Sequence, residues 1–173
     1  MVKKFNSKKK LNYVFFWQPD KNYLSTNCFS QWQKSNFIVE GKHYNCAEQY
    51  MMGQKALIFN DLETFEKILS ANHPKQMKSL GREVKNFDSN EWDNVKYSIV
   101  LNGNFYKFTQ NEEMLKILLS TGDKILVEAS PFDKIWGVGL SEDNKSINNP
   151  NYWKGQNVLG FALMEVRDEI KNI

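Results

Sequence analysis

The sequence contains few of the side chains that metal and disulfide chemistry require. Among its 173 residues are two cysteines, Cys28 and Cys46, and two histidines, His43 and His73. Two cysteines make neither a disulfide framework nor a metal site, and we expect each to be a small buried side chain in a reducing compartment. A zinc hydrolase or a Ser-His-Asp hydrolase would have to use one of the two histidines without any supporting motif. The sequence therefore predicts no bound metal.

Other absences narrow the class of protein further. No apolar run reaches membrane length and no signal-peptide core is found, so we expect a cytoplasmic protein without a membrane partner. No P-loop or Rossmann glycine pattern occurs, and no cofactor is predicted. Aromatic residues, in contrast, are abundant, with 5 Trp, 7 Tyr and 12 Phe. Such side chains mostly fill cores, but they also stack on sugars and bases.

Basic residues are concentrated at the amino end. Five lysines and no acidic residue fall within the first ten positions, and without those lysines 18 basic and 20 acidic residues remain. The rest of the chain is therefore not the basic surface that grips a phosphate backbone. We expect residues 1–12 to form a flexible tail and residues 13–173 to form one domain. A weak anchor to RNA, DNA or a nuclear import receptor is the alternative for the lysine run.

The hydrophobic pattern indicates a single α+β domain that is dominated by helices and has a small β-sheet. Short apolar runs at 14–17 and 124–129 are typical of strands, and residues 37–44 are typical of a hairpin around Glu40-Gly41. Helices are expected at 45–59, 62–69, 74–81, 91–108, 111–119 and 158–170.

Local signals also place helix ends and one long loop. Ser89 is a suitable cap for the longest helix, and Gly81 is expected to close the third. Residues 130–156 are rich in Gly, Asn and Pro and follow the second predicted strand. A loop of this length is a candidate functional loop.

An acid and an amine lie two helical turns apart in the first long helix. Glu48 and Lys55 are separated by seven residues, so their side chains project from nearly the same face. Asn45-Cys46-Ala47-Glu48 also fits a capping box, in which Glu48 bonds back to the cap, and a helical lysine is usually solvated. The functional alternative is a carboxylate at a positive helix end that faces a cleft, with an amine that holds a phosphate or reacts with a sugar aldehyde.

Further candidates follow along the chain. Arg82 comes directly after Gly81, and it forms either a structural ion pair or a bidentate clamp for a phosphate. Asp133 follows the second strand, and it either caps a turn or supplies a second carboxylate beside Trp136. The glycine at Gly137 lets the backbone approach a ligand closely. Two carboxylates, a lysine, an arginine and tryptophans suit cleavage of a bond to a sugar anomeric carbon, because the transition state is oxocarbenium-like.

Taken together, these motifs resemble the NADAR family, which is also called YbiA-like. The resemblance runs in order over roughly residues 14–167, nearly the whole chain. The matching motifs are Phe16-Trp17, Gly41-Lys42-His43-Tyr44, Ala47-Glu48-Gln49-Tyr50-Met51-Met52, Lys55-Ala56, Leu80-Gly81-Arg82, Trp92, Lys107-Phe108, Leu118-Leu119-Ser120-Thr121-Gly122, Leu126-Val127-Glu128-Ala129-Ser130-Pro131, Asp133, Trp136-Gly137-Val138-Gly139, Trp153-Gly155-Asn157-Leu159-Gly160 and Met164-Glu165-Val166-Arg167. The lysine-rich start lies outside the family pattern.

The resemblance implies a YbiA-like fold and a hydrolase that acts on N-glycosyl compounds. Similar family members cleave the N-glycosidic bond of the first two, reactive intermediates of riboflavin biosynthesis, which are ribosylaminopyrimidine phosphates. Cleavage gives ribose 5-phosphate and harmless products, a form of metabolite damage control. Two alternatives stay open. One is a glycohydrolase that removes ADP-ribose from guanine in nucleic acid, for which the lysine tail would matter. The other is a non-catalytic module that binds ADP-ribose or a nucleotide.

The resemblance also implies which residues form the site. Glu48, Trp92 and Asp133 are expected active-site positions, and Lys55 takes part either beside the anomeric oxygen or through an imine with the opened ribose. Glu48 and Asp133 divide the roles of acid, base and stabiliser.

The remaining members of the expected site bind substrate. Trp92 and Trp136 are expected to stack on the base or to frame the pocket, and Arg82 is expected to bind the phosphate. Phe16 and Gly137, both within matching motifs, complete the expected substrate-binding set.

Overall fold

The computed structural model describes residues 12–19 and 24–173. The expected lysine-rich tail therefore lies outside the described residues except at its last position. Within the described ranges, six α-helices accompany four short strands. The predicted α+β class is confirmed, although the described strands form two separate pairs and not one sheet.

The first pair brings together two strands that are far apart in the sequence. β1 (Tyr13–Phe16) and β4 (Ile125–Glu128) run parallel, with Phe16 opposite Glu128 at their carboxyl ends. Both strands lie where the apolar runs predict them. Because the strands are parallel, the segments that follow them begin at the same edge, which is where ligands bind in many open sheets.

The second pair is the predicted hairpin. β2 (Phe37–Val39) and β3 (Lys42–Tyr44) are antiparallel, and the turn between them is Glu40-Gly41. Both turn residues have positive φ angles, 50° and 76°, as a two-residue turn matched to strand twist requires.

The helices around α1 form one half of the molecule. α1 (Ala47–Ile58) packs against α2 (Leu62–Ser70) and α3 (Pro74–Arg82). The expectation that Gly81 closes α3 is wrong, because the helix continues through Arg82. An added Cβ at Gly81 would overlap the Met52 side chain, so this glycine allows α1 and α3 to approach closely.

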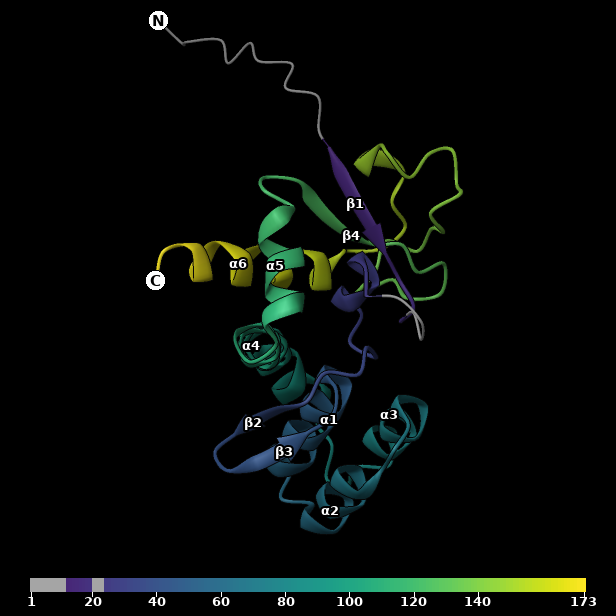
Figure 1. Cartoon of the computed structure of the whole chain (residues 1–173). Coiled ribbons are helices and arrows are strands. Elements are labelled where there is room, and N and C mark those ends of the chain that lie inside the picture. The colour runs from purple at the N-terminus through teal and green to yellow at the C-terminus, as the bar shows by residue number, and fades with distance from the viewer. Residues whose placement is uncertain (1–11, 20–23) are drawn as a thin grey trace, which may run out of the picture.

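A long central helix joins this half to the other. α4 (Ser89–Thr109) packs against both α1 and α6 (Val158–Lys171), and α5 (Glu112–Ser120) follows it. In Figure 1, α1, α2, α3 and the hairpin lie on one side of α4, while β1, β4, α5 and α6 lie on the other. The cap of α4 is Asp88 and not the expected Ser89, since Asp88 Oδ1 accepts the Glu91 N–H at 2.9 Å.

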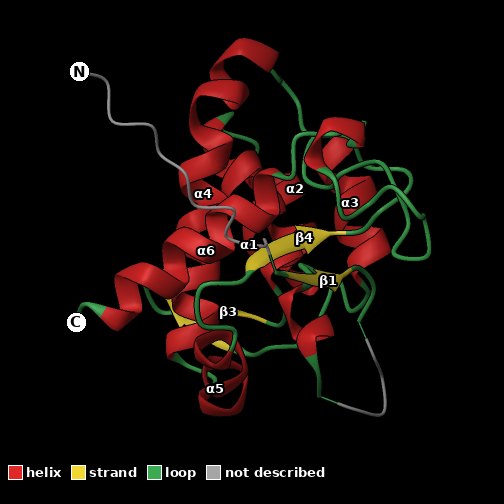
Figure 2. Ribbon diagram, turned by 90° about the horizontal axis from the view of Figure 1, so that it is seen from above, coloured by secondary structure: helices red, strands yellow, loops and turns green. Residues whose placement is uncertain are grey.

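Side-chain contacts fix α6 against β4, and Figure 2 shows the strands from above with the helices around them. Asn157, which precedes α6 with a φ of 54°, accepts the Glu128 N–H and donates to the Leu126 carbonyl oxygen. An added Cβ at Gly160 would overlap that same carbonyl oxygen. The missing side chain at residue 160 therefore sets how closely the helix approaches the strand. Two short 3-10 helices, Thr26–Phe29 and Pro150–Tyr152, lie in the connecting segments.

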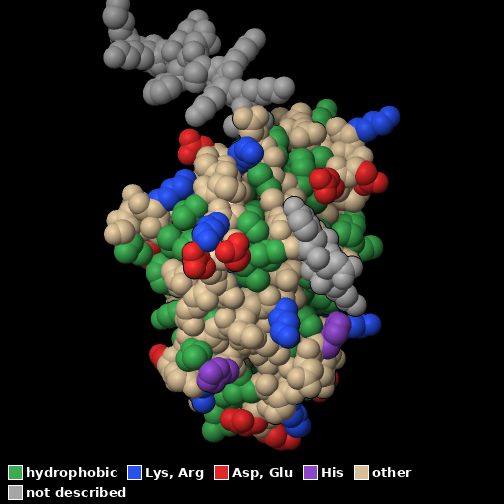
Figure 3. Space-filling view, viewed as in Figure 1, with side chains coloured by type: hydrophobic (Ala, Val, Ile, Leu, Met, Phe, Trp, Pro, Cys, Tyr) green, Lys and Arg blue, Asp and Glu red, His purple; other side chains and the backbone are tan. Residues whose placement is uncertain are grey.

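The surface matches the charge analysis. On the face shown in Figure 3, Lys and Arg side chains are scattered among Asp and Glu and do not gather into one basic patch. Among the helices that the structure describes, none combines the length and the apolar character of a membrane span.

We predict that Gly160→Ala destabilises the fold, because the new methyl group meets the Leu126 carbonyl oxygen in a packed interior. Overpacking of this kind costs about 1–3 kcal/mol, which lowers Tm by roughly 2–12 °C. Thermal unfolding followed by circular dichroism measures the change. The control is Phe161→Ala at the next position, where the side chain is half-exposed. Equal melting temperatures for Gly160→Ala and the wild type would contradict the close packing of α6 on β4.

Candidate active site

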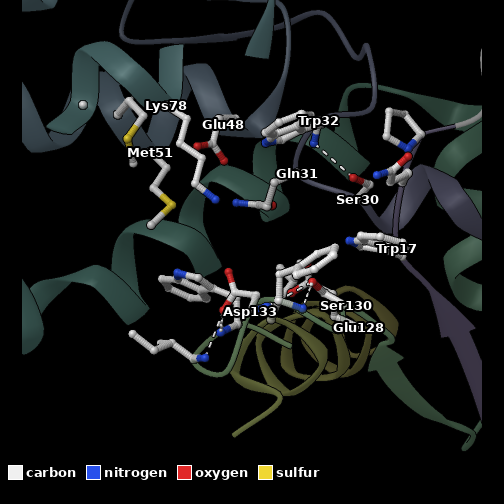
Figure 4. A pocket seen from close by; sticks show the side chains of 18 of the residues that line it. Trp17, Ser30, Gln31, Trp32, Glu48, Met51, Lys78, Glu128, Ser130 and Asp133 are labelled. Atoms are coloured by element: carbon white, nitrogen blue, oxygen red, sulfur yellow. Dashed lines mark hydrogen bonds between the residues drawn. The ribbon is translucent and has the colours of Figure 1, made fainter. Parts of the chain in front are cut away.

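A cavity of about 780 Å³ lies between the two halves of the molecule, a volume typical of small-molecule sites. On one side is the helix wall, which we define as Glu48 and Lys55 of α1 with Lys78 and Arg82 of α3. On the other side is the loop wall, which we define as Glu128, Asp133 and Trp136. Figure 4 shows Glu48 and Lys78 pointing from the helices towards Asp133 and Glu128.

Glu48 is buried at the start of α1 and does not cap it. Its backbone N–H donates to the Gln31 carbonyl oxygen at 3.0 Å, and its side chain is only 6% exposed. The cap residue Cys46 makes no side-chain capping bond, and the Asn45 N–H is bound by Gln49 Oε1 at 2.8 Å. The capping-box interpretation of Glu48 is therefore wrong. Gln49 forms the hydrogen bond at the helix start instead, and the Glu48 carboxyl group is left to face the cavity.

The surroundings of Glu48 bring its titration close to neutral pH. Burial raises the pKa of Glu48 to about 7, because the charged form is poorly solvated there. The Lys78 ammonium group and a hydrogen bond from Trp32 act in the opposite direction, and the Asp133 charge raises the pKa further. Both the ionised and the neutral forms of Glu48 are therefore accessible near pH 7.

Lys55 lines the same cavity, as the spacing from Glu48 predicts, but it lies at the far end of α1. Seven residues of helix correspond to about 10 Å along the axis. Lys55 Nζ donates to the Gly81 carbonyl oxygen at 2.6 Å and lies 4.0 Å from the centre of the Phe87 ring. Burial lowers the pKa of Lys55. It is therefore a partly desolvated amine and not the freely solvated surface lysine considered above.

The cation that acts most strongly on Glu48 is Lys78, which sequence reasoning missed. Its signal was present, since Lys78 and Arg82 are four residues apart in a predicted helix and so share one face. Lys78 is half-buried, while Arg82 is exposed. Together they give the α3 side of the cavity a positive charge.

Asp133 holds its own loop and also faces the cavity. Its Oδ1 accepts the backbone N–H groups of Ile135 and Trp136 at 2.9 and 2.8 Å, and its own N–H donates to Ser130 Oγ. The turn-capping and cavity-facing interpretations therefore hold together. One carboxylate oxygen fixes the loop, and the other takes no part in these turn bonds.

Glu128 is the second cavity residue that sequence reasoning missed. It is the last residue of β4, and its Oε2 atom is buried without a hydrogen-bond partner among the described residues. Burial raises the pKa of Glu128 to about 8, and the charges of Asp133 and Glu48 add to this effect. An acidic residue at the end of a buried apolar strand was the available signal.

Three residues that were expected to contact the substrate lie outside the lining of the cavity. Phe16 is 1% exposed and packs at right angles to Phe29, so the neighbouring Trp17 lines the cavity instead. Trp92 is 9% exposed, and its ring centre lies 5.7 Å from Lys55 Nζ. Gly137 lies where an added Cβ would be 2.9 Å from the Glu128 carbonyl oxygen. None of the three is among the described residues that line the cavity.

Aromatic and amide groups complete the lining. Trp17 and the 84% exposed Phe132 lie at one side of the cavity with ring centres 6.0 Å apart, and Trp136 is part of the loop wall. Gln31 points into the cavity in Figure 4. Its Oε1 accepts a hydrogen bond from Asn104 of α4 at 2.9 Å, so the amide NH₂ group remains to face a ligand.

The arrangement suits acid–base chemistry on a sugar without help from a metal ligand set. Among the described residues, no group of three His, Cys, Asp or Glu is placed to hold a metal ion. Inside this cavity the Asp133 charge raises the pKa of both Glu48 and Glu128, and the Glu48 charge raises that of Glu128. Carboxyl groups held in unlike surroundings separate into an acid and a base, which is the requirement for glycoside hydrolysis.

Comparison with known proteins agrees with this chemistry. The family model described as NADAR domain matches residues 15–171. N-glycosidase R617 of Acanthamoeba polyphaga mimivirus is 47% identical over 163 residues, which cover 91% of this chain and 95% of that protein. Riboflavin biosynthesis protein VVA0006 of Vibrio vulnificus (strain YJ016) is 29% identical over 158 residues, 91% of this chain but 38% of that longer protein. The NMR structure of the E. coli protein YbiA has a TM-score of 0.72 at 25% identity, covering 95% of this chain and 90% of that one.

The buried carboxyl groups predict an unusual dependence of stability on pH. The folded state holds protons on Glu48 and Glu128 up to pKa values of about 7 and about 8, whereas a glutamate in the unfolded chain has its ordinary pKa of 4.5. Between these limits the folded state binds more protons, so the free energy of unfolding falls as pH rises from about 5 to about 8. Urea denaturation at a series of pH values measures this free energy of unfolding.

The matched variant for this prediction is Glu128→Gln, which cannot titrate at that position. Its free energy of unfolding should fall less steeply than that of the wild type throughout the range from about pH 5 to about pH 8. Parallel curves for the two proteins would show that Glu128 is already ionised in the folded state near pH 6.

Proposed function

The chain belongs to the NADAR domain family and is a hydrolase that acts on N-glycosyl compounds, and on this premise we propose that its substrates are ribosylaminopyrimidine phosphates. These are the first two, reactive intermediates of riboflavin biosynthesis, and their hydrolysis gives ribose 5-phosphate. The observation that carries the proposal is the cavity itself, where buried carboxyl groups on both walls lie beside the cations of α3. Similarity to a protein named for riboflavin biosynthesis supports the choice of substrate.

Asp133 and Glu48 are proposed to act on the ribose ring of the substrate. Breaking the C1–N bond builds positive charge on the ribose ring, which a nearby carboxylate stabilises. Asp133 faces the cavity with an oxygen that its turn bonds do not use, and Glu48 is ionised in part at neutral pH. In the proposed mechanism Asp133 stabilises the oxocarbenium ion, and Glu48 takes the proton of the attacking water.

The cations of α3 are proposed to hold the phosphate. Arg82 is exposed at the cavity, and its planar guanidinium group binds a phosphate through two parallel hydrogen bonds. Lys78 lies one helical turn earlier and adds a second positive charge. This orientation places the phosphate near α3 and the base near the aromatic residues Trp17, Trp136 and Phe132, which can stack on a pyrimidine ring.

Lys55 has two proposed roles that the structure allows equally. It can hold the anomeric oxygen by a hydrogen bond, or it can attack C1 and form an imine with the opened ribose. Burial lowers its pKa, which increases the fraction of neutral, nucleophilic amine. In either role Trp92 and Phe87 act on substrate through Lys55, because their rings lie 5.7 and 4.0 Å from Nζ.

The second candidate substrate is ADP-ribosylated guanine in nucleic acid. The volume of about 780 Å³ lies towards the upper end for small-molecule sites and is more than a ribosylaminopyrimidine phosphate fills. The five lysines within the first ten residues would attract a polyanionic substrate at low salt.

We predict that Glu48→Gln lowers kcat/KM for a ribosylaminopyrimidine phosphate by about 100-fold or more, because the amide cannot accept the proton of water. The melting temperature should not fall, because Glu48 does not cap α1 and its buried carboxyl group itself costs stability at neutral pH. Release of ribose 5-phosphate measures the reaction, with ADP-ribosylated guanine assayed beside it.

Gln49→Glu is the matched control for Glu48→Gln. Gln49 Nε2 donates to the carbonyl oxygens of Ile68, Leu69 and Ala71, so loss of the NH₂ group should lower the melting temperature. Full activity of Glu48→Gln would exclude the catalytic role of Glu48. If the wild type hydrolysed only ADP-ribosylated guanine, the second candidate would replace the first, and binding of ADP-ribose without turnover would identify a non-catalytic module.

The imine role of Lys55 predicts a covalent adduct. Borohydride added during turnover should reduce the imine and leave a ribosyl phosphate group on Lys55, which peptide mass spectrometry locates. Lys55→Arg should yield no adduct, whereas Lys78→Arg should keep the adduct on Lys55. An unmodified Lys55 under turnover conditions would leave only the hydrogen-bonding role.

A further inference from the structure

We propose that Glu128 is the catalytic acid that protonates the leaving nitrogen when the N-glycosidic bond breaks. This inference rests on the proposed N-glycosidase function and assigns the one role that Glu48 and Asp133 leave unfilled. Three observations support it. Glu128 lines the cavity, one of its carboxyl oxygens is buried without a hydrogen-bond partner among the described residues, and the hydrogen bonds and charges around it differ from those around Glu48 and Asp133.

The backbone of Glu128 is held firmly on both sides. Its N–H donates to Asn157 Oδ1 at 3.0 Å, and its carbonyl oxygen accepts the Val138 N–H at 3.0 Å. The parallel pairing with Phe16 fixes the end of the strand. These bonds aim the side chain into the cavity from a rigid element, which is the placement that proton transfer requires.

One oxygen of the Glu128 carboxyl group is buried but has no hydrogen-bond partner in the described part of the chain. The Oε2 atom is buried, and none of the described residues forms a hydrogen bond with it. A buried polar atom left in this way costs stability, so native proteins rarely keep one without a function. The same carboxyl group lines the cavity, where a substrate nitrogen would be its hydrogen-bond partner.

The charges around Glu128 favour its neutral form. Asp133 of the following loop and Glu48 of α1 both disfavour a further negative charge, and Lys78 of α3 is the cation that opposes them. Lys55, Arg82 and Lys134 complete the charged lining of the cavity. Burial has the largest effect and raises the pKa of Glu128 to about 8, so the group still carries its proton at neutral pH.

The other two carboxyl groups have surroundings that suit the opposite role. Glu48 lies close to Lys78 and accepts a hydrogen bond from Trp32, and both interactions favour its ionised form. Asp133 accepts two backbone N–H groups through Oδ1, an arrangement that fits a carboxylate. Of the three, Glu128 alone has no described hydrogen-bond donor on a buried carboxyl oxygen.

The proposed step balances as follows. The Glu128 carboxyl group gives its proton to the nitrogen as the C1–N bond breaks, and the bonding electron pair stays on that nitrogen. Water adds its oxygen to C1, and its proton passes to the Glu48 carboxylate. The products are the amine and ribose 5-phosphate, and a proton then returns from Glu48 to Glu128 directly or through solvent.

The test compares pH profiles of kcat/KM for Glu128→Gln and the wild type on a ribosylaminopyrimidine phosphate. An essential acid makes the wild-type profile fall on its alkaline side, near pH 8. In Glu128→Gln we expect activity to drop about 100-fold or more and the residual rate to lose this alkaline fall. Binding of ribose 5-phosphate, measured by calorimetry, should be preserved, which a structural role would not predict.

Two further variants make the result decisive. Glu142→Gln changes an exposed acid of the long loop outside the cavity and should keep the wild-type profile. Glu128→Asp withdraws the carboxyl group by one methylene, so kcat should fall at least about 10-fold while an alkaline fall remains. If Glu128→Gln does not fold, Glu128→Asp decides the question, and wild-type kcat in that variant overturns the proposal.

The outcomes also separate this inference from the proposed function. A wild type that turns over ribosylaminopyrimidine phosphate, with a Glu128→Gln variant of similar rate and the same alkaline fall, overturns the role of Glu128 alone. A wild type without turnover on this substrate or on ADP-ribosylated guanine overturns the proposed function and the inference together.

Discussion

Two glutamate carboxyl groups that are buried beside Asp133 in one cavity resist ionisation at neutral pH, and this constraint governs the site. Burial raises the pKa of both Glu48 and Glu128, the Asp133 charge raises both further, and Lys78 offsets only part of this effect. Protons are therefore retained at neutral pH in a cavity that also presents cations and aromatic rings. The same burial that destabilises the fold at higher pH provides a base and an acid within reach of one sugar.

The fold holds the two walls of this cavity at a fixed separation. α4 contacts both halves, and it supports the cavity lining directly through Asn104, which holds the Gln31 side chain, and Lys107, which donates to the Ser30 carbonyl oxygen at 2.9 Å. On the helix wall, Gln49 ties α1 to the end of α2. On the loop wall, Asn157 ties the end of β4 to the start of α6. Glu48 and Glu128 are thus carried by a helix and a strand, and Asp133 by a loop that its own hydrogen bonds to Ile135 and Trp136 hold in place.

Local patterns were sufficient to predict the elements and part of the site. The strands, the hairpin and the helices follow from short-range periodicity, and the spacing of Glu48 and Lys55 follows from helix geometry. The failures have physical causes. Phe16 and Trp17 are adjacent in the sequence, yet only Trp17 lines the cavity, because successive side chains at a strand point to opposite faces. Glu128 gains its properties from burial and from the charges of Asp133, Glu48 and Lys78, which no local pattern encodes. Gly81 was misjudged because the Met52 side chain that it meets is in another helix.

The central claim is that one ligand is held between the helix wall and the loop wall. The most direct measurement is titration of the ¹⁵N-labelled protein with ribose 5-phosphate, followed by amide and indole chemical shifts. The account predicts saturable shifts on both sides of the cavity, at Lys78 and Arg82 and at Glu128, Asp133 and Trp136, with α2 and the β2–β3 hairpin unchanged. Shifts confined to one wall, or centred on a surface away from the cavity, would contradict it.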